Sequence, residues 1–164
     1  AHNQANMQAA AVCAEALGIS RQIVARAIAN VTLIHGHMER VAGPPEIPFA
    51  IYLDDANTPD SLEKVLTSLL GSKVCVVSGE KLWVQPLLGS IAGTHCRAII
   101  LTESEKEIAR GISKPITTIV ATERAAIARA IRNAQTGETV LFAGNGFSAQ
   151  TVLEELNVWK QETY

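Results

Sequence analysis

The spacing of apolar side chains differs between the first part of the chain and the rest. At first it follows the helical period, which predicts one helix over Asn6–Leu17 that ends at Gly18 and a second helix that Ser20 can cap. The Gly43-Pro44-Pro45 cluster then interrupts the pattern. Because glycine and proline end regular elements, we expect a boundary between residues 36 and 46.

After residue 46, short apolar runs alternate with stretches of helical period. The runs predict five strands, at Phe49–Leu53, Lys73–Val77, Ala98–Thr102, Ile116–Ala121 and Thr139–Ala143. Strands buried on both faces of a sheet are apolar throughout, and parallel strands need helical crossovers. The pattern therefore predicts an α/β fold: a Rossmann-like, mostly parallel sheet flanked by helices and preceded by a short helical segment.

Three of the helices associated with these strands have identifiable starts. Thr58, followed by Pro59, and Thr122 are typical N-terminal caps, and a last helix follows Ser148. The helix after Thr58 is predicted to bury one apolar face, made of Leu62, Val65, Leu66, Leu69 and Leu70.

Composition and charge limit the kinds of partner. The chain is 48% hydrophobic and 18% charged, with a formal net charge of -2. This balance argues against nucleic acid or an anionic membrane surface as the main partner. No apolar run approaches the ~20 residues of a membrane span, and the start of the chain lacks the pattern of a secretory signal. We expect a cytoplasmic protein and, because the chain begins without Met, an excised domain or fragment.

The cysteines predict no covalent or metal framework. Cys13, Cys75 and Cys96 are odd in number, widely spaced and set among apolar residues. We interpret them as buried free thiols in a reducing cytosol.

The polar residues that follow the first predicted strand are the first candidate site. Asp54 and Asp55 come directly after an apolar run, at the edge where open α/β sheets bind ligands. A carboxylate at such a strand end can accept hydrogen bonds from a ribose, so Asp54 is a candidate ligand for a nucleoside. Asp60 lies in a first helical turn, where it offsets the helix dipole.

A second candidate is the loop Ala143–Ser148, which joins the last strand to the last helix. Its two glycines allow backbone N–H groups to approach an anion at the start of the helix, although glycines in such a turn often serve the backbone alone. His35 and His37 lie near Glu39, but further ligands at zinc spacing are missing. We predict no metal site and no catalytic residue in this chain.

Five segments, in order, resemble motifs of one family. The first is His2–Asn6 with Ala9–Ala11, the second Gly36–Val41, the third Asp54–Leu62, the fourth Glu123–Ile127 and the fifth Ala143–Ser148. They are similar to H-N-x-x-N-x-x-A-A, G-R-M-E-x-V, D-Y-A-H-T-P-D-S-L, D-R-x-x-A-I and A-G-K-G-H-E of the Mur ligases. The chain resembles their C-terminal part, in the branch of the UDP-N-acetylmuramoyl-tripeptide synthetases, which adds the third residue of the peptidoglycan stem peptide.

The resemblance implies a domain organisation and an activity. Residues 1–35 would be the terminal helices of the central ATPase domain, 36–46 a linker and 47–164 the C-terminal domain. Such ligases use ATP and Mg to activate a carboxylate of a UDP-muramoyl peptide and join it to an amino acid. Within them, the C-terminal domain closes over the nucleotide and presents the incoming amino acid. This chain lacks the P-loop and would depend on N-terminal and central domains that it does not contain.

The resemblance also implies site residues. Those that would lie near the nucleotide are Asn3, Asn6, His37, Asp54 and Asn57. Those that would lie near the incoming amino acid are Glu103, Asn145 and Gly146.

The chain departs from the family at several functional positions. Residues that differ from the motifs are His37, Asp55, Asn57, Asn145, Phe147 and Ser148. Gly79–Trp83 stands in place of a glycine- and arginine-rich segment, and Glu103–Lys106 in place of the D-N-P-R of diaminopimelate-adding members, so the resemblance does not extend to that specificity. Two alternatives therefore stay open beside a working ligase domain. One is a non-catalytic binding or scaffold module, and the other is an unrelated doubly wound domain that binds a small anion at Gly144–Ser148.

Overall fold

The computed structural model describes residues 2–31, 34–78, 85–112 and 116–163. The chain divides into two compact units, Ala1–Ile34 and His35–Tyr164. Gly79–Trp83, which stands where the family has a glycine- and arginine-rich segment, lies outside the described residues.

The first unit consists of two helices, α1 (His2–Ala16) and α2 (Arg21–Ala29). Gly18 ends α1 with φ +87°, a conformation that glycine adopts without strain. Ser20 stands at the N-cap of α2, as expected, but its side chain makes no capping hydrogen bond. The prediction that all three cysteines are buried is wrong for Cys13, which is exposed on α1 because neither helix covers that face.

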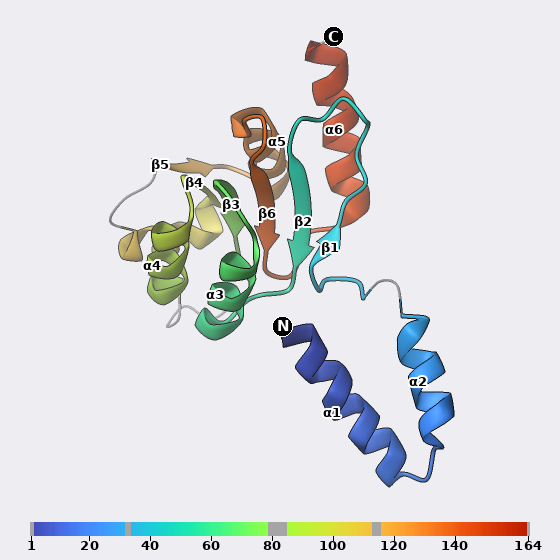
Figure 1. The fold of residues 1–164 in the computed structure, drawn as a ribbon. Coiled ribbons are helices and arrows are strands. Elements are labelled where there is room, and N and C mark those ends of the chain that lie inside the picture. Colours follow the sequence, from blue (N-terminus) through green and yellow to red (C-terminus); the bar gives the residue numbers. More distant parts are fainter. Residues whose placement is uncertain (1, 32–33, 79–84, 113–115, 164) are drawn as a thin grey trace. The chain divides into compact units, whose positions relative to one another are not determined.

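The second unit is built on a six-stranded sheet in the order β1-β2-β6-β3-β4-β5 (Figure 1). Its strands are β1 (Glu39–Arg40), β2 (Ala50–Asp54), β3 (Lys73–Val77), β4 (Ala98–Thr102), β5 (Ile116–Val120) and β6 (Thr139–Ala143). Only β1 is antiparallel to its neighbour. Five strands confirm the predicted runs to within one residue at each end. β1, which lies in the expected linker, was not predicted because two residues carry no periodic signal.

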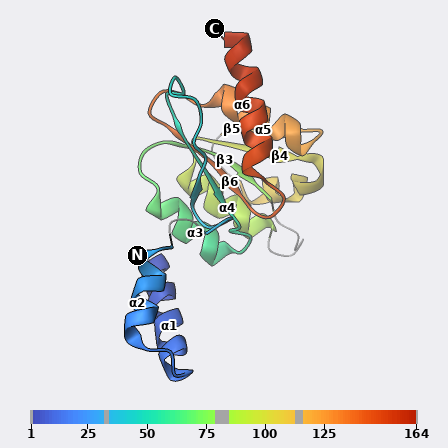
Figure 2. The same ribbon diagram turned by 90° about the vertical axis from the view of Figure 1, so that its right-hand side faces the viewer.

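Helices cover both faces of this sheet (Figures 1 and 2). The first face carries α3 (Pro59–Ser68), α4 (Gln85–His95) and the 3-10 helix η1 (Glu103–Gly111), and the opposite face carries α5 (Glu123–Asn133) and α6 (Ala149–Thr163). Successive residues of each strand point to opposite faces, so each strand contributes to two cores. The mostly parallel α/β fold is therefore confirmed.

Two predicted helix starts are confirmed by their hydrogen bonds. The Thr58 hydroxyl accepts from the Ser61 N–H at 3.3 Å, and the Thr122 hydroxyl accepts from the Ala125 N–H at 3.2 Å. The predicted inward face of α3 is wrong in one residue. Leu70 is 88% exposed, because the helix ends at Ser68 and the chain turns before it.

An ion pair between the buried Glu138 and the half-buried Arg97 joins three strands at the amino edge of the sheet. Glu138, which is 5% exposed, receives hydrogen bonds from Arg97 Nε at 2.6 Å and Nη2 at 2.7 Å, and also from Ser72 and the Gln135 N–H. These residues directly precede or border β3, β4 and β6. The guanidinium of Arg97 is the main reason that the pKa of Glu138 falls to about 2.

We expect Arg97→Ala to lower the free energy of unfolding by about 3 kcal/mol at pH 7, because Glu138 would stay buried without its partner. A depressed pKa stabilises the folded state above the unfolded pKa of 4.5, and this contribution is lost as the pH falls toward about 2. The difference from wild type should therefore shrink over that window in urea denaturation curves. Arg110→Ala, which removes an exposed ion pair, is the matched control and should cost less than about 1 kcal/mol.

Candidate functional site

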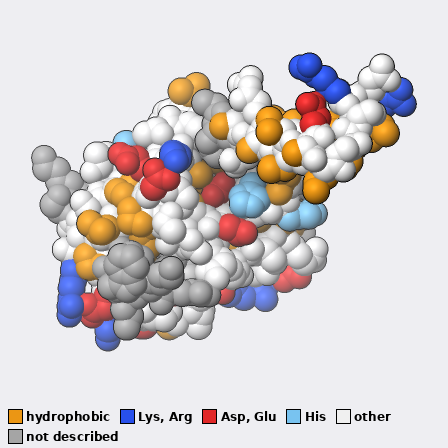
Figure 3. Space-filling model, turned by 90° about the horizontal axis from the view of Figure 1, so that it is seen from below, with side chains coloured by type: hydrophobic (Ala, Val, Ile, Leu, Met, Phe, Trp, Pro, Cys, Tyr) orange, Lys and Arg blue, Asp and Glu red, His pale blue; other side chains and the backbone are white. Residues whose placement is uncertain are grey.

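The carboxyl ends of three neighbouring strands are joined directly by backbone hydrogen bonds. The Gly144 N–H, after β6, donates to the carbonyl of Asp54 at the end of β2, at 2.8 Å. The Ser78 N–H, after β3, donates to the carbonyl of Ala143 at 2.8 Å. Ligands of open α/β sheets bind outside this edge. Figure 3 views the molecule from the side toward which the strands run, and acidic and histidine side chains lie on that face.

Asp54 is buried at this edge and bound to the start of the second unit. The residue is 6% exposed, and its Oδ2 accepts from the Met38 N–H at 2.8 Å. Burial raises the pKa of Asp54, while the Met38 N–H and the neighbouring His37 oppose that rise. Because one oxygen already has a partner, Asp54 also serves to hold the polypeptide that precedes β1.

The other residues predicted to bind the nucleotide differ in where they lie. His37 and Asn57 are both exposed. His37 directly precedes Met38, whose N–H binds Asp54, and Asn57 follows Asp54 on the loop after β2. Asp55, also exposed, donates its N–H to the carbonyl of Gly36 at 2.7 Å. Asn6 is exposed on α1 in the first unit, whereas the side chain of Asn3 lies outside the described part of the structure.

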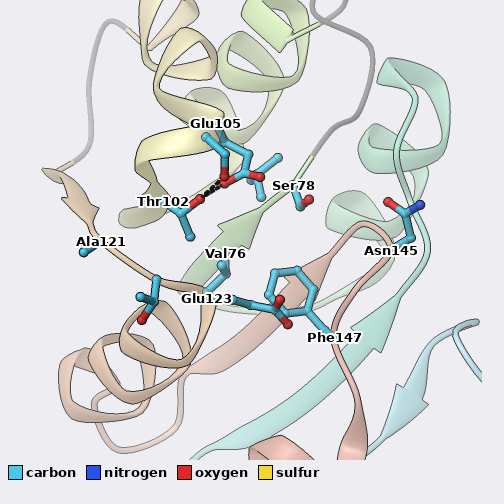
Figure 4. A pocket seen from close by; sticks show the side chains of 11 residues that line it. Val76, Ser78, Thr102, Glu105, Ala121, Glu123, Asn145 and Phe147 are labelled. Atoms are coloured by element: carbon cyan, nitrogen blue, oxygen red, sulfur yellow. Dashed lines mark hydrogen bonds between the residues drawn. The ribbon is translucent and has the colours of Figure 1, made fainter.

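A cavity of about 140 Å³ lies between the carboxyl ends of β3, β4 and β5 and the loop after β6 (Figure 4). Its polar and aromatic lining consists of Ser78, Thr102, Ser104, Glu105, Thr122, Glu123, Asn145 and Phe147. Two of these residues are carboxylates from different elements, Glu105 on η1 and Glu123 at the start of α5. Burial, and then repulsion by Glu105, raises the pKa of Glu123.

The cavity includes one of the three residues predicted to bind the amino acid. Asn145 lines it, whereas Glu103 is exposed at the start of η1 and is not part of the lining. Gly146 lies beside it, since a Cβ at this position would be 3.8 Å from a carboxylate oxygen of Glu123. Sequence reasoning did not select Glu105 and Glu123. Both lie in segments compared with family motifs, Glu103–Lys106 and Glu123–Ile127, and the fold shows that they line one cavity.

The described residues offer no built metal centre. Across residues 2–31, 34–78, 85–112 and 116–163, no group of three or more His, Cys, Asp or Glu side chains could hold a metal ion. His35 contacts Glu39 instead, with 3.2 Å between Nδ1 and Oε2.

Taken together, the structure defines an open α/β domain with a polar carboxyl edge and a small cavity at that edge. Residues 36–146 match the family model described as the Mur ligase, glutamate ligase domain, so the chain belongs to this family. The resemblance seen in the motifs is thereby confirmed, and an unrelated doubly wound domain is excluded.

Similar proteins include two curated ligases named UDP-N-acetylmuramoyl-L-alanyl-D-glutamate--2,6-diaminopimelate ligase. The one from Synechococcus elongatus is 31% identical, over 92% of this chain and 34% of its own length. The one from Xanthomonas campestris is 33% identical, over 88% of this chain and 32% of its own length. The chain thus spans about a third of the length of these relatives.

Solved structures share the fold. UDP-N-acetylmuramate-alanine ligase from Thermotoga maritima has a TM-score of 0.76 at 16% identity, covering 99% of this chain and 38% of that one. A UDP-N-acetylmuramoyl-L-alanyl-D-glutamate--2,6-diaminopimelate ligase has a TM-score of 0.65 at 22% identity, covering 96% and 39%. None of the helices in the described residues is long and apolar enough to cross a membrane.

The segment after β3 lies so close to Gly144, in the loop after β6, that a larger residue at this position should destabilise the fold. A Cβ there would lie 2.5 Å from the carbonyl oxygen of Ser78, whereas one at Gly146 would be at least 3.8 Å from any neighbour. Both glycines have similar positive φ angles, +113° and +115°. We expect Gly144→Ala to reduce the free energy of unfolding by about 2 kcal/mol more than Gly146→Ala, because only the first adds a collision. Equal losses in urea denaturation would contradict this geometry.

Proposed function

We propose that this chain is the part of an ATP-dependent amide ligase that closes over the nucleotide and presents the incoming amino acid. In this proposal it works with N-terminal and central domains, in the cytoplasm, and the acceptor is a UDP-muramoyl peptide of peptidoglycan synthesis. The observation that carries the proposal is the polar edge around Asp54 in a chain of the Mur ligase family. Amide formation itself would take place against the central domain, since this chain has no P-loop.

The side chains at this edge suit the sugar and base of a nucleotide better than its phosphates. The exposed Asp55 carboxylate can accept from ribose hydroxyls, and the Asn57 amide can both donate and accept. His37 is charged only when protonated and cannot reproduce the fork of an arginine. We therefore assign the phosphates and Mg to the central domain, whose bound nucleotide supplies the phosphoryl group for activating a carboxylate.

The cavity is proposed to receive the incoming amino acid. Asn145 lies at its wall, as the family resemblance implies. The carboxylates of Glu105 and Glu123 are unfavourable for a ligand group that is itself a carboxylate. This lining, together with Glu103–Lys106 in place of D-N-P-R, gives no support to diaminopimelate as the amino acid, although that compound appears in the names of the relatives.

A non-catalytic binding module is the second candidate. It is favoured by the partner that Asp54 already has, because the Met38 N–H occupies one of the two oxygens that a ribose would use. ATP-dependent formation of an amide separates the two candidates, since only the ligase performs it.

The first test uses the protein as encoded by its gene, supplied with ATP, Mg, UDP-muramoyl dipeptide and a mixture of amino acids. Asn57→Ala should raise the KM for ATP roughly tenfold and change kcat less, because one hydrogen bond to the nucleotide is lost. Asn157→Ala, an exposed asparagine on α6, is the matched control and should leave both constants unchanged. If the wild-type protein forms no amide and releases no ADP, the ligase proposal is wrong.

The second test uses the 164-residue chain by itself. We expect no ADP release and no amide formation under the same conditions, because the chain has no P-loop to hold the phosphates. Turnover by the isolated chain, measured by coupled release of ADP, would refute the proposal that the central domain binds the phosphates.

A further inference from the structure

The second unit begins with a turn, His35–Glu39, that has an uncommon backbone. Gly36 has φ +70° and Met38 has φ +53°, so two of three successive residues are left-handed. For a residue with a side chain, such as Met38, this conformation costs about 1 kcal/mol or more. It persists only where neighbouring groups hold it in place.

Two buried carboxylates accept hydrogen bonds from the backbone of this turn. Glu39 is 9% exposed, and its Oε2 accepts from the Gly36 N–H at 3.1 Å and lies 3.2 Å from Nδ1 of His35. Asp54 accepts from the Met38 N–H. The backbone N–H groups on either side of His37 are thus both fixed by carboxylates.

His37 is the residue whose position these contacts determine. Its side chain is exposed, and its neighbours on both sides are bound. Gly36 has φ +70°, which other residues adopt only with strain, and a Cβ there would displace the exposed carboxylate of Asp55. The turn therefore restricts the direction in which the His37 side chain projects from the backbone.

The Glu39 side chain contributes to this turn and not to the cores of the unit. It lies on the two-residue strand β1, and its polar contacts are with residues three and four positions earlier. Loss of its carboxylate should therefore loosen the turn while the sheet stays intact.

We propose that Glu39 is a positioning residue. Its buried carboxylate fixes the His35–Glu39 turn and thereby holds His37 beside Asp54 for contact with the nucleotide. This inference rests on the proposed function, because it assigns to Glu39 a role in nucleotide binding that acts through His37.

The test begins with amide hydrogen exchange in the protein as encoded by its gene. Glu39→Ala should accelerate exchange at Gly36 roughly tenfold, because the acceptor of that N–H is removed. Glu63→Ala removes an exposed carboxylate on α3 and should leave this rate unchanged. An unchanged Gly36 rate in Glu39→Ala would overturn the proposed clamp.

Kinetics then test whether the turn serves the nucleotide. Glu39→Ala should raise the KM for ATP about tenfold with a smaller change in kcat, and Glu39→Gln should raise it less, because its amide oxygen still accepts from the Gly36 N–H. In a double-mutant cycle, adding Glu39→Ala to His37→Ala should have little further effect.

The outcomes distinguish the role of Glu39 from the ligase activity itself. Additive effects in the cycle, or faster Gly36 exchange with an unchanged KM, would overturn the role of Glu39 while the ligase proposal stands. Failure of the wild-type protein to form an amide would overturn both. A non-additive cycle with accelerated exchange supports the positioning role.

Discussion

Asp54 connects two segments that form the carboxyl edge of the sheet, where a ligand is expected to bind. Its carbonyl receives the N–H of Gly144 from the loop after β6, and its carboxylate receives the N–H of Met38 from the turn before β1. One residue therefore fixes two segments that are far apart in the sequence. Its burial has a cost, seen in the raised pKa, and the Met38 N–H offsets part of that cost.

The architecture was largely readable from the sequence, because each element left a local signal. Strands such as Lys73–Val77 are continuous apolar runs, and Thr58 and Thr122 mark helix starts by their capping chemistry. The elements that escaped prediction lack such signals. α4 contains two glycines and a proline, and η1 is rich in charged residues with one buried side chain, Ile108. The exposure of Leu70 shows the same limit, since the pattern did not reveal where α3 ends.

The candidate site was less predictable than the fold, for a physical reason. A strand end can be found from its sequence, but the partners across the edge depend on strand order. β6 enters between β2 and β3, which brings Asn145 and Phe147 opposite residues that follow β3, β4 and β5. Glu105 and Glu123 line one cavity because β4 and β5 are neighbours, and Met38 binds Asp54 because β1 pairs with β2.

The same insertion of β6 governs how the chain reaches its folded state. All five residues of β6 are buried, and they pair with β2 on one side and β3 on the other, so that Ala50 and Lys73 both meet Thr139. Contacts between residues so distant in sequence give a high contact order, and such topologies fold slowly. During synthesis the central sheet stays incomplete until the C-terminal segment leaves the ribosome. Until then the inner edges of β2 and β3 remain unpaired, which is the state most open to aggregation or chaperone capture.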